Sequence, residues 1–140
     1  MMNAAPALTR TILDSRLRPV LIELNNSSQH IHACAAITRD GIPISFVLDD
    51  KISADRLGAI ASSLLSLSQT ASTELSQGKL KQVLIEGENG YILTVEAGNN
   101  AVLSIVAEKS VNLGMIFIEA RRTAQDIISL LTAAPNAAVI

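Results

Sequence analysis

Both histidines and the only cysteine of this 140-residue chain lie within five positions, as His30, His32 and Cys34. A spacing of two would place them on one face of a β-strand, and imidazole and thiolate groups are ligands that zinc prefers. A strand rises about 3.3 Å per residue, so the Cα atoms of His30 and Cys34 would stand roughly 13 Å apart. Metal bonds of about 2.0 to 2.3 Å cannot easily bridge that span. Adjacent pairs could share an ion, but all three residues could not.

A metal site on His30 and His32 would need Asp or Glu ligands from elsewhere, and the sequence shows no second cluster of suitable spacing. The alternative is structural, with His30 at a strand entrance, His32 hydrogen-bonded in a sheet and Cys34 as a small buried hydrophobe. We favour this alternative and expect no metal, no cofactor and no catalytic residue. A nucleophilic Cys34 would also need exposure and a neighbouring base, and a strand covered on both faces offers neither.

Other sequence motifs of enzyme chemistry are missing. The chain contains no G-x-S-x-G, no G-x-x-x-x-G-K-[ST] and no G-x-G-x-x-G that opens a helix. The stretch GENGY is therefore expected to be a solvated hairpin tip and not a phosphate loop.

The composition narrows the class of partner. The chain is 49% hydrophobic and 17% charged with a net charge of −2, and 2% of its residues are aromatic. This balance argues against nucleic acid, which needs phosphate-neutralising charge or aromatic stacking. No segment has the roughly 20 apolar residues of a membrane span, and the N-terminus lacks the apolar run of a secretory signal. With one cysteine there is no internal disulfide, so we expect a cytoplasmic protein.

Hydrophobic periodicity predicts helices near residues 9–25, 53–75 and 112–132. Pro19 falls in the first turn if Ser15 is the N-cap, and kinks the helix if the helix starts earlier. Alternating patterns predict two strands around Asp40-Gly41, a dipeptide typical of a type I′ turn. Three further strands are predicted in KLKQVLIE from 79, YILTVEA from 91 and AVLSIVAEK from 101.

Hairpin connections make the predicted sheet antiparallel, with helices covering its faces. The fold class is α+β, a single α-β-β-α-β-β-β-α domain with five strands. We place the domain at residues 15–132, preceded by a partly flexible extension at 1–14 and followed by a flexible tail at 133–140.

The predicted central helix carries no charge from Leu57 to Thr73. Its apolar stripe is Leu57, Ile60, Ala61, Leu64, Leu67, Ala71 and Leu75. We expect Leu57, Ala61, Leu64 and Ser68 to face the sheet. The opposite face carries small neutral side chains, at Ala59, Ser62, Ser63, Ser66, Gln69, Thr70 and Thr73. A second subunit can approach such a face without burying an unpaired charge. The alternative is an ordinary Ser-rich surface helix, and we favour the interface.

The element order and three stretches resemble the roadblock family, the dynein light chain roadblock-type domain. The stretches are AAITRDGIPIS, DRLGAIASSLLSLSQTASTEL and GKLKQVLIEGENGYILTVEAGNNAVLSIVAEKSVNLGMIFIEARR, and the resemblance spans about residues 15 to 130. It implies profilin-like or longin-like layering, with the first and last helices on one face of the sheet and the central helix on the other. It also implies a homodimer in which central helices pair and third strands, with Lys81, Val83 and Ile85, join two sheets.

Members of this family are regulators and scaffolds of small Ras-like GTPases or light chains of the dynein motor, and bacterial members commonly accompany a GTPase of the gliding-motility type. The short chain is most similar to the bacterial kind. The resemblance therefore implies a non-catalytic homodimer that binds a small GTPase and alters its nucleotide cycle or position. The alternative is a self-assembling scaffold or motor-complex subunit without effect on GTP hydrolysis. No motif marks the GTPase-contacting residues.

Overall fold

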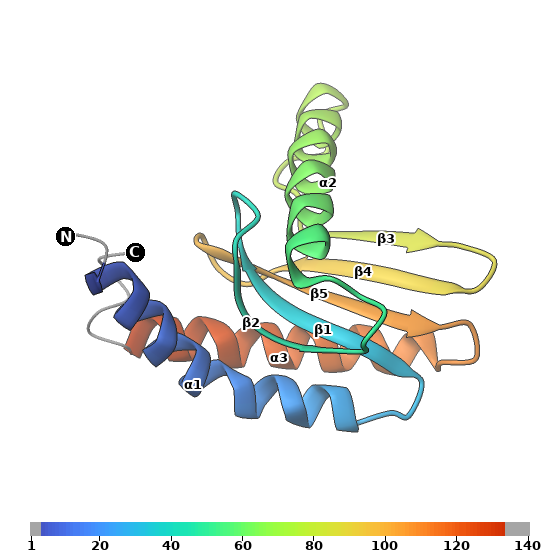
Figure 1. Cartoon of the computed structure of the whole chain (residues 1–140). Helices are drawn as coiled ribbons and strands as arrows, with labels where there is room; N and C mark the ends of the chain where they lie inside the picture. The colour runs from blue at the N-terminus through green and yellow to red at the C-terminus, as the bar shows by residue number, and fades with distance from the viewer. Residues whose placement is uncertain (1–3, 134–140) are drawn as a thin grey trace.

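Three helices enclose a five-stranded antiparallel sheet in the computed structural model, which describes residues 4–133. The sheet order is β2-β1-β5-β4-β3, with α1 and α3 on one face and α2 crossing the other (Figure 1). The predicted α+β fold class and element order are confirmed. The elements are α1 (Ala4–Asn26), β1 (Ile31–Thr38), β2 (Pro43–Leu48), α2 (Ala54–Glu74), β3 (Gln82–Glu86), β4 (Gly90–Glu96), β5 (Ala101–Glu108) and α3 (Leu113–Ala133).

The larger core lies between the sheet and the layer formed by α1 and α3. Leucines of α1 recur at spacings of three and four, so one stripe of the helix faces the sheet. They meet strand residues whose side chains point to the same face, and α3 adds a second apolar stripe. The largest side chains in this core are Leu13, Leu17, Leu21, Leu24, Leu93, Leu103, Ile105, Ile116 and Ile127, each at most 1% exposed.

A smaller core lies between the sheet and α2. It consists of three residues from α2 and three from the central strands, namely Leu57, Ala61, Leu65, Ala35, Ile37 and Val102. Because both cores share β1 and β5, these two strands are buried on both faces.

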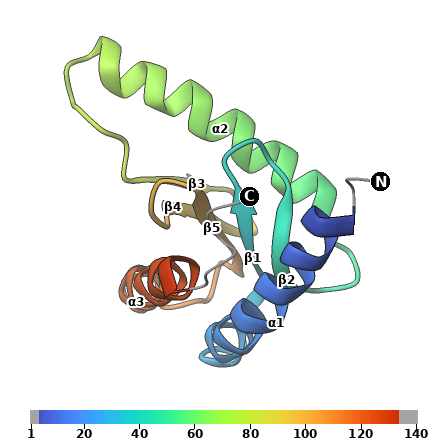
Figure 2. The same cartoon turned by 90° about the vertical axis from the view of Figure 1, so that its left-hand side faces the viewer.

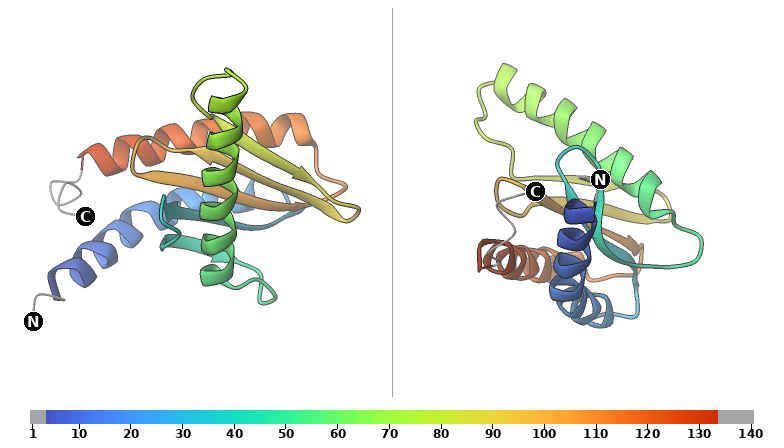
Figure 3. Two further views of the ribbon diagram at one scale, coloured as in Figure 1. Left: turned by 90° about the horizontal axis from the view of Figure 1, so that it is seen from above. Right: turned by 60° about the vertical axis from the view of Figure 1, so that its left-hand side comes forward.

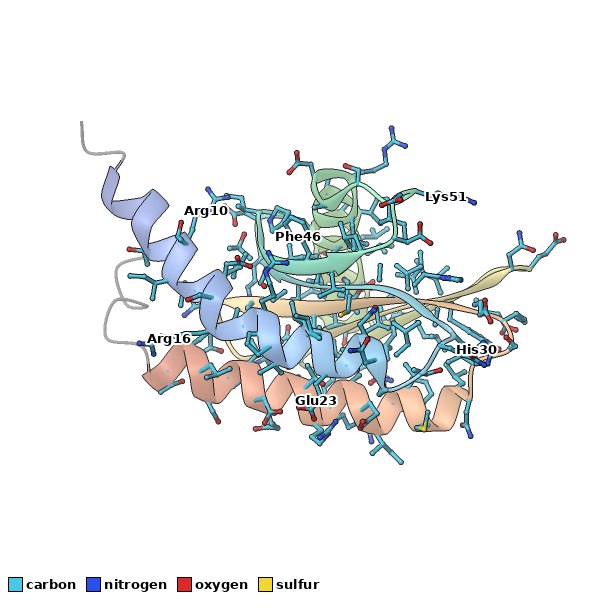
Figure 4. The ribbon with its side chains drawn as sticks, turned by 60° about the horizontal axis from the view of Figure 1, so that its bottom comes forward. Arg10, Arg16, Glu23, His30, Phe46 and Lys51 are labelled. Carbon is cyan, nitrogen blue, oxygen red and sulfur yellow. The ribbon has the colours of Figure 1, made fainter. Side chains whose placement is uncertain are left out.

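The first helix is longer than the sequence indicated. It begins at Ala4, so residues 4–14, which the sequence pattern places before the domain, lie in α1. Pro19 therefore lies inside the helix, where it has no N–H to donate to the carbonyl of Ser15. Figure 4 shows that α1 changes direction along its length, as a proline in a helix interior causes. Of the predicted tail at 133–140, only Ala133 lies within the described residues.

Local side-chain chemistry sets the other helix starts as predicted. Ser53 caps α2 by accepting from the Arg56 N–H at 3.3 Å. Asn112 Oδ1 accepts from the Met115 N–H at 3.1 Å at the start of α3.

The predicted hairpin at Asp40-Gly41 is confirmed, but the predicted type I′ turn is wrong. Among the residues that join β1 to β2, Gly41 has a positive φ of 97° and Asp40 does not. The Gly41 N–H donates to the Thr38 carbonyl, and the Thr38 N–H donates to the Ile42 carbonyl. A type I turn followed by a glycine bulge fits this pattern, and Gly41 supplies the one left-handed residue that it requires.

A β-bulge at His32 interrupts the alternation of β1. Ile31 pairs with Ala107 and Ala33 with Val106 of β5, so His32 is an extra residue on β1. Ile31 therefore joins Cys34 in the core beneath α1 and α3. The single strand face that the sequence suggested for His30, His32 and Cys34 does not exist.

The described helices include none that is long and apolar enough to cross a membrane.

Two glycines let α2 touch the β1–β2 hairpin. A Cβ atom on Gly58 would lie 2.2 Å from the Gly41 carbonyl oxygen, closer than any real Cβ contact. The first turn of α2 can therefore pack on the hairpin backbone because Gly58 has no side chain.

We predict that Gly58→Ala destabilises the fold by about 1–3 kcal/mol, because helix and hairpin must separate to admit a methyl group. Urea denaturation with linear extrapolation measures the loss. Gly114→Ala in α3 is the matched control. Its Cβ would meet Asn112 Oδ1 at an ordinary 3.5 Å, and alanine favours the helix by up to about 1 kcal/mol. A Gly58→Ala variant as stable as the native chain would contradict the packing.

Candidate protein interface

The buried side of α2 is narrow and ends halfway along the helix. Within Ala54–Glu74 the buried residues are Leu57, Gly58, Ala61 and Leu65. Leu65 was missing from the predicted stripe, whereas Leu64 is half-buried. Figure 2 shows that the C-terminal half of α2 rises away from the sheet before the chain returns to β3. The helix thus packs on its own sheet with its first three turns.

Several members of the predicted apolar stripe do not pack on the sheet. Leu67 is 70% exposed, Leu75 is 71% exposed and Ile60 is 42% exposed. Together with Leu64 and Ala71, these residues follow one another at spacings of three or four along the helix. All five therefore lie on one flank of α2. We call this flank the exposed stripe: Ile60, Leu64, Leu67, Ala71 and Leu75. A continuous aliphatic flank of this kind is a mark of an interaction surface.

Two predicted interface residues make internal contacts on the other flank of α2. Ser62 Oγ donates to the Arg39 carbonyl at 3.0 Å, and Gln69 Oε1 accepts from the Leu80 N–H at 3.2 Å. These hydrogen bonds tie α2 to the β1–β2 hairpin and to the segment that leads into β3. The remaining predicted residues of that face are exposed, namely Ala59, Ser63, Ser66, Thr70 and Thr73.

The exposed stripe faces the half of the sheet that α2 leaves uncovered. At 100° per residue, Leu67 and Ala71 lie on the flank opposite Ser62 and Gln69. In Figure 1, β3 and β4 extend past α2 on this side, and Figure 3 shows the same from above. Ile85 and Ile92, paired on β3 and β4, lie here and are half-buried. Helix flank and sheet face together form an apolar corner.

The β3 strand is an open edge of the sheet. The Glu96 N–H donates to the Lys81 carbonyl and the Gly87 N–H to the Gly90 carbonyl. Bonded and non-bonded pairs alternate in antiparallel sheets, so Val83 and Ile85 also bond to β4. Gln82, Leu84 and Glu86, which lie between them, direct their backbone N–H and C=O groups away from the sheet.

The predicted third-strand residues therefore offer side chains and not backbone groups to a partner. Val83 and Ile85 point to the α2 side of the sheet, since they pair with Thr94 and Ile92. Lys81 precedes β3, which begins at Gln82.

The opposite edge, β2, is occupied by α1. Arg18 of α1 donates through Nη1 to the Phe46 carbonyl at 2.8 Å, and its guanidinium lies 5.7 Å from the centre of the Phe46 ring. Asp14 accepts from the same guanidinium at 2.8 Å and orients it. Figure 4 shows α1 running beside Phe46. The two edges of the sheet thus differ, because α1 covers β2 and nothing within residues 4–133 covers β3.

The histidines meet a carboxylate that sequence reasoning missed. Glu108 at the end of β5 contacts His30 Nδ1 through one oxygen, and its other oxygen lies 3.4 Å from His32 Nε2. Ser110 Oγ donates to Glu108 at 2.8 Å. This hydrogen bond, followed by that from His30, lowers the pKa of the Glu108 carboxyl. The pairing therefore stabilises the fold above the ordinary carboxyl pKa and is lost as the pH falls through the lowered value.

The cluster at Glu108 does not constitute a metal site. Among residues 4–133, no three His, Cys, Asp or Glu side chains stand together as ligands would. Glu108 lies 78 positions from His30 in sequence, and no local spacing could have indicated the contact. Cys34 is fully buried, and its Sγ donates to the Leu21 carbonyl at 3.3 Å. The expected packing role of Cys34 is confirmed.

Comparison with known proteins identifies a matching family and relatives of this chain. The family model described as Roadblock/LC7 domain matches residues 4–107. Two uncharacterised proteins of the archaeon Methanocaldococcus jannaschii are each 35% identical over 108 residues, which is 77% of this chain and 93% of theirs.

Two bacterial proteins of solved structure share this fold. The gliding protein MglB from Thermus thermophilus superposes with a TM-score of 0.78 at 18% identity, covering 87% of this chain and 93% of that one. A Roadblock/LC7 domain from Streptomyces avermitilis gives a TM-score of 0.76 at 23% identity, covering 81% and 96%. With sequence relatives from an archaeon and structures from bacteria, the expected bacterial type stays a prediction.

We predict that Cys34 resists thiol reagents in the native protein. Burial raises the pKa of this thiol to about 12, so at pH 8 only about one molecule in 10⁴ carries a thiolate. Reaction with a chromogenic disulfide reagent should be negligible in buffer and rapid in urea. Fast stoichiometric labelling without denaturant would show that β1 is not covered as described.

Proposed function

Because the chain belongs to the Roadblock/LC7 family, we propose that it is a non-catalytic homodimeric module that binds a small Ras-like GTPase and alters its nucleotide cycle or position. The observation that carries this proposal is the apolar corner formed by the exposed stripe of α2 and the sheet face, together with the open β3 edge beside it. The role of other family members with small GTPases supports the proposed binding of a GTPase.

A second copy of the chain is the partner that fits the corner. An open strand edge pairs with an identical edge across a two-fold axis, which closes the assembly at two chains. The same rotation brings the two α2 helices side by side on one face of the joined sheet. Each exposed stripe then faces the other, and Leu67 and Ile60 lose contact with water. Burial of aliphatic side chains is the main driving force of such association.

The outward face of the paired helices is the surface left for a GTPase. Between Leu57 and Thr73 the exposed residues of this face are neutral and small, namely Ala59, Ser63, Ser66, Thr70 and Thr73. The sequence pattern favoured this face for a second subunit, and we reassign it to the GTPase. From Leu57 to Thr73 this face has no arginine to place against a transferring phosphate. We therefore propose that this module positions the GTPase, and that the catalytic groups are those of the GTPase itself. The single buried cysteine supports a reducing, cytoplasmic location.

We predict that Leu67→Glu weakens the dimer by more than about tenfold, because it would bury an unpaired charge between two helices. Ser66→Glu is the matched control, since Ser66 is the neighbouring residue on the outward face. Sedimentation equilibrium gives the two dissociation constants. If Ser66→Glu separated the subunits and Leu67→Glu did not, the polar face would be the interface and the exposed stripe would not.

A second prediction concerns the GTPase. Purified chain should change the single-turnover rate of GTP hydrolysis by a small Ras-like GTPase that co-purifies with it. Ser66→Glu should remove the effect while leaving the dimer intact, because it places a charge on the outward face of the paired helices. A dimer that binds the GTPase and leaves both hydrolysis and nucleotide release unchanged would instead be a scaffold.

A further inference from the structure

We propose that two copies of this chain join along β3 in one register, with Leu84 on the two-fold axis. The inference rests on the proposed homodimer and names the residue pairs that form its seam. It follows from the direction of each backbone group on β3 and from the chemistry of the side chains between them.

The hydrogen-bond pattern limits the registers that are possible. Gln82, Leu84 and Glu86 direct their backbone groups outward, whereas Val83 and Ile85 bond to β4. Two β3 strands related by a two-fold axis run antiparallel, so an outward residue must meet an outward residue. The axis can therefore pass through Val83, Leu84 or Ile85 but not between two residues.

The register centred on Leu84 uses every outward group of the strand. Gln82 meets the partner's Glu86, Leu84 meets the partner's Leu84, and Glu86 meets the partner's Gln82. Each of these three pairs exchanges two backbone hydrogen bonds. The register centred on Val83 keeps two pairs, because its third would need Leu80, whose N–H already donates to Gln69. The register centred on Ile85 also keeps two pairs within β3.

Side chains on both faces fit the Leu84 register. On the α2 face, Val83 stands opposite the partner's Ile85 and extends the apolar floor beneath the two helices. On the other face, Leu84, which is 38% exposed in the single chain, packs against the partner's Leu84. Large aliphatic pairs directly opposite each other stabilise antiparallel seams.

The ends of the seam carry a polar pair. Gln82 of one chain lies opposite the partner's Glu86, so its amide can donate to that carboxylate. Lys109 contacts the Glu86 carboxylate and lies 4.7 Å from the centre of the Tyr91 ring, which holds Glu86 on this face of the sheet. No like charges oppose each other at the seam in this register, and the seam is therefore self-complementary.

Single cysteines test the register in the full chain. Opposed bonded residues have Cα atoms about 5.5 Å apart, a distance that a disulfide spans, and residues two positions out of register do not. We expect Leu84→Cys to form a covalent dimer under mild oxidation and Val83→Cys to form none. The native chain, with Cys34 alone, serves as the blank. Light scattering under reducing conditions reports whether each variant is dimeric before oxidation.

The outcomes separate the register from the dimer. Cross-linking of Val83→Cys in place of Leu84→Cys would overturn the register, and so would dimeric variants that both fail to cross-link, as a seam centred on Ile85 or a different interface would give. A monomeric native chain would overturn the proposed function itself. As a second measurement without cysteine, Gln82→Glu should raise the dissociation constant about three- to tenfold, since it opposes two carboxylates at each end of the seam. Gln82→Lys should leave it equal or lower, and identical effects of both changes would contradict the pairing with Glu86.

Discussion

The place of α2 on the sheet depends on the contact between Gly41 and Gly58. This contact pins the first turns of the helix to the β1–β2 hairpin at a distance that no other residue type permits. Because a straight helix cannot follow the twist of the sheet, its later turns leave the surface, and burial along α2 ends at Leu65. The apolar residues beyond that point are exposed as a consequence of where the helix begins.

The sheet presents a matching asymmetry. Backbone groups at a strand edge attract other strands, and α1 removes one such edge by placing Arg18 on the carbonyl of Phe46. The other edge, β3, stays open on the side of the molecule where α2 stands clear (Figure 2). A free edge and an exposed helix flank at the same border are the two features that a sheet-to-sheet partner would use.

Much of the fold could be predicted from the sequence, because local chemistry decides it. Ser53 and Asn112 cap helices, Asp40-Gly41 marks a hairpin, and the period of the apolar residues changes with each element. The interface side of α2 could not be predicted this way. Leu64, Leu65 and Leu67 are equally apolar, and which of them is buried depends on the tilt of the helix against the sheet.

Other misreadings come from non-local or single-residue effects. Glu108 reaches His30 across the sheet, and the bulge at His32 reverses the alternation on which the shared face of His30, His32 and Cys34 was based. Pattern reasoning treats a strand as regular, so one inserted residue changes every face assignment before it. The bulge leaves the strand-length argument almost unchanged, because a single bulge shortens an extended segment only slightly.

The missing charge on α2 has two separate physical causes. On one flank, Ser62 and Gln69 bond to backbone groups of the hairpin and of Leu80, where a charged side chain would lose water without gaining a counter-ion. On the other flank, the exposed stripe is aliphatic although nothing in the described part of the single chain covers it, and this flank has no internal reason to be apolar. The first cause acts within one chain. The second requires another molecule that covers the exposed stripe, and the open β3 edge beside the stripe favours an identical chain as that molecule.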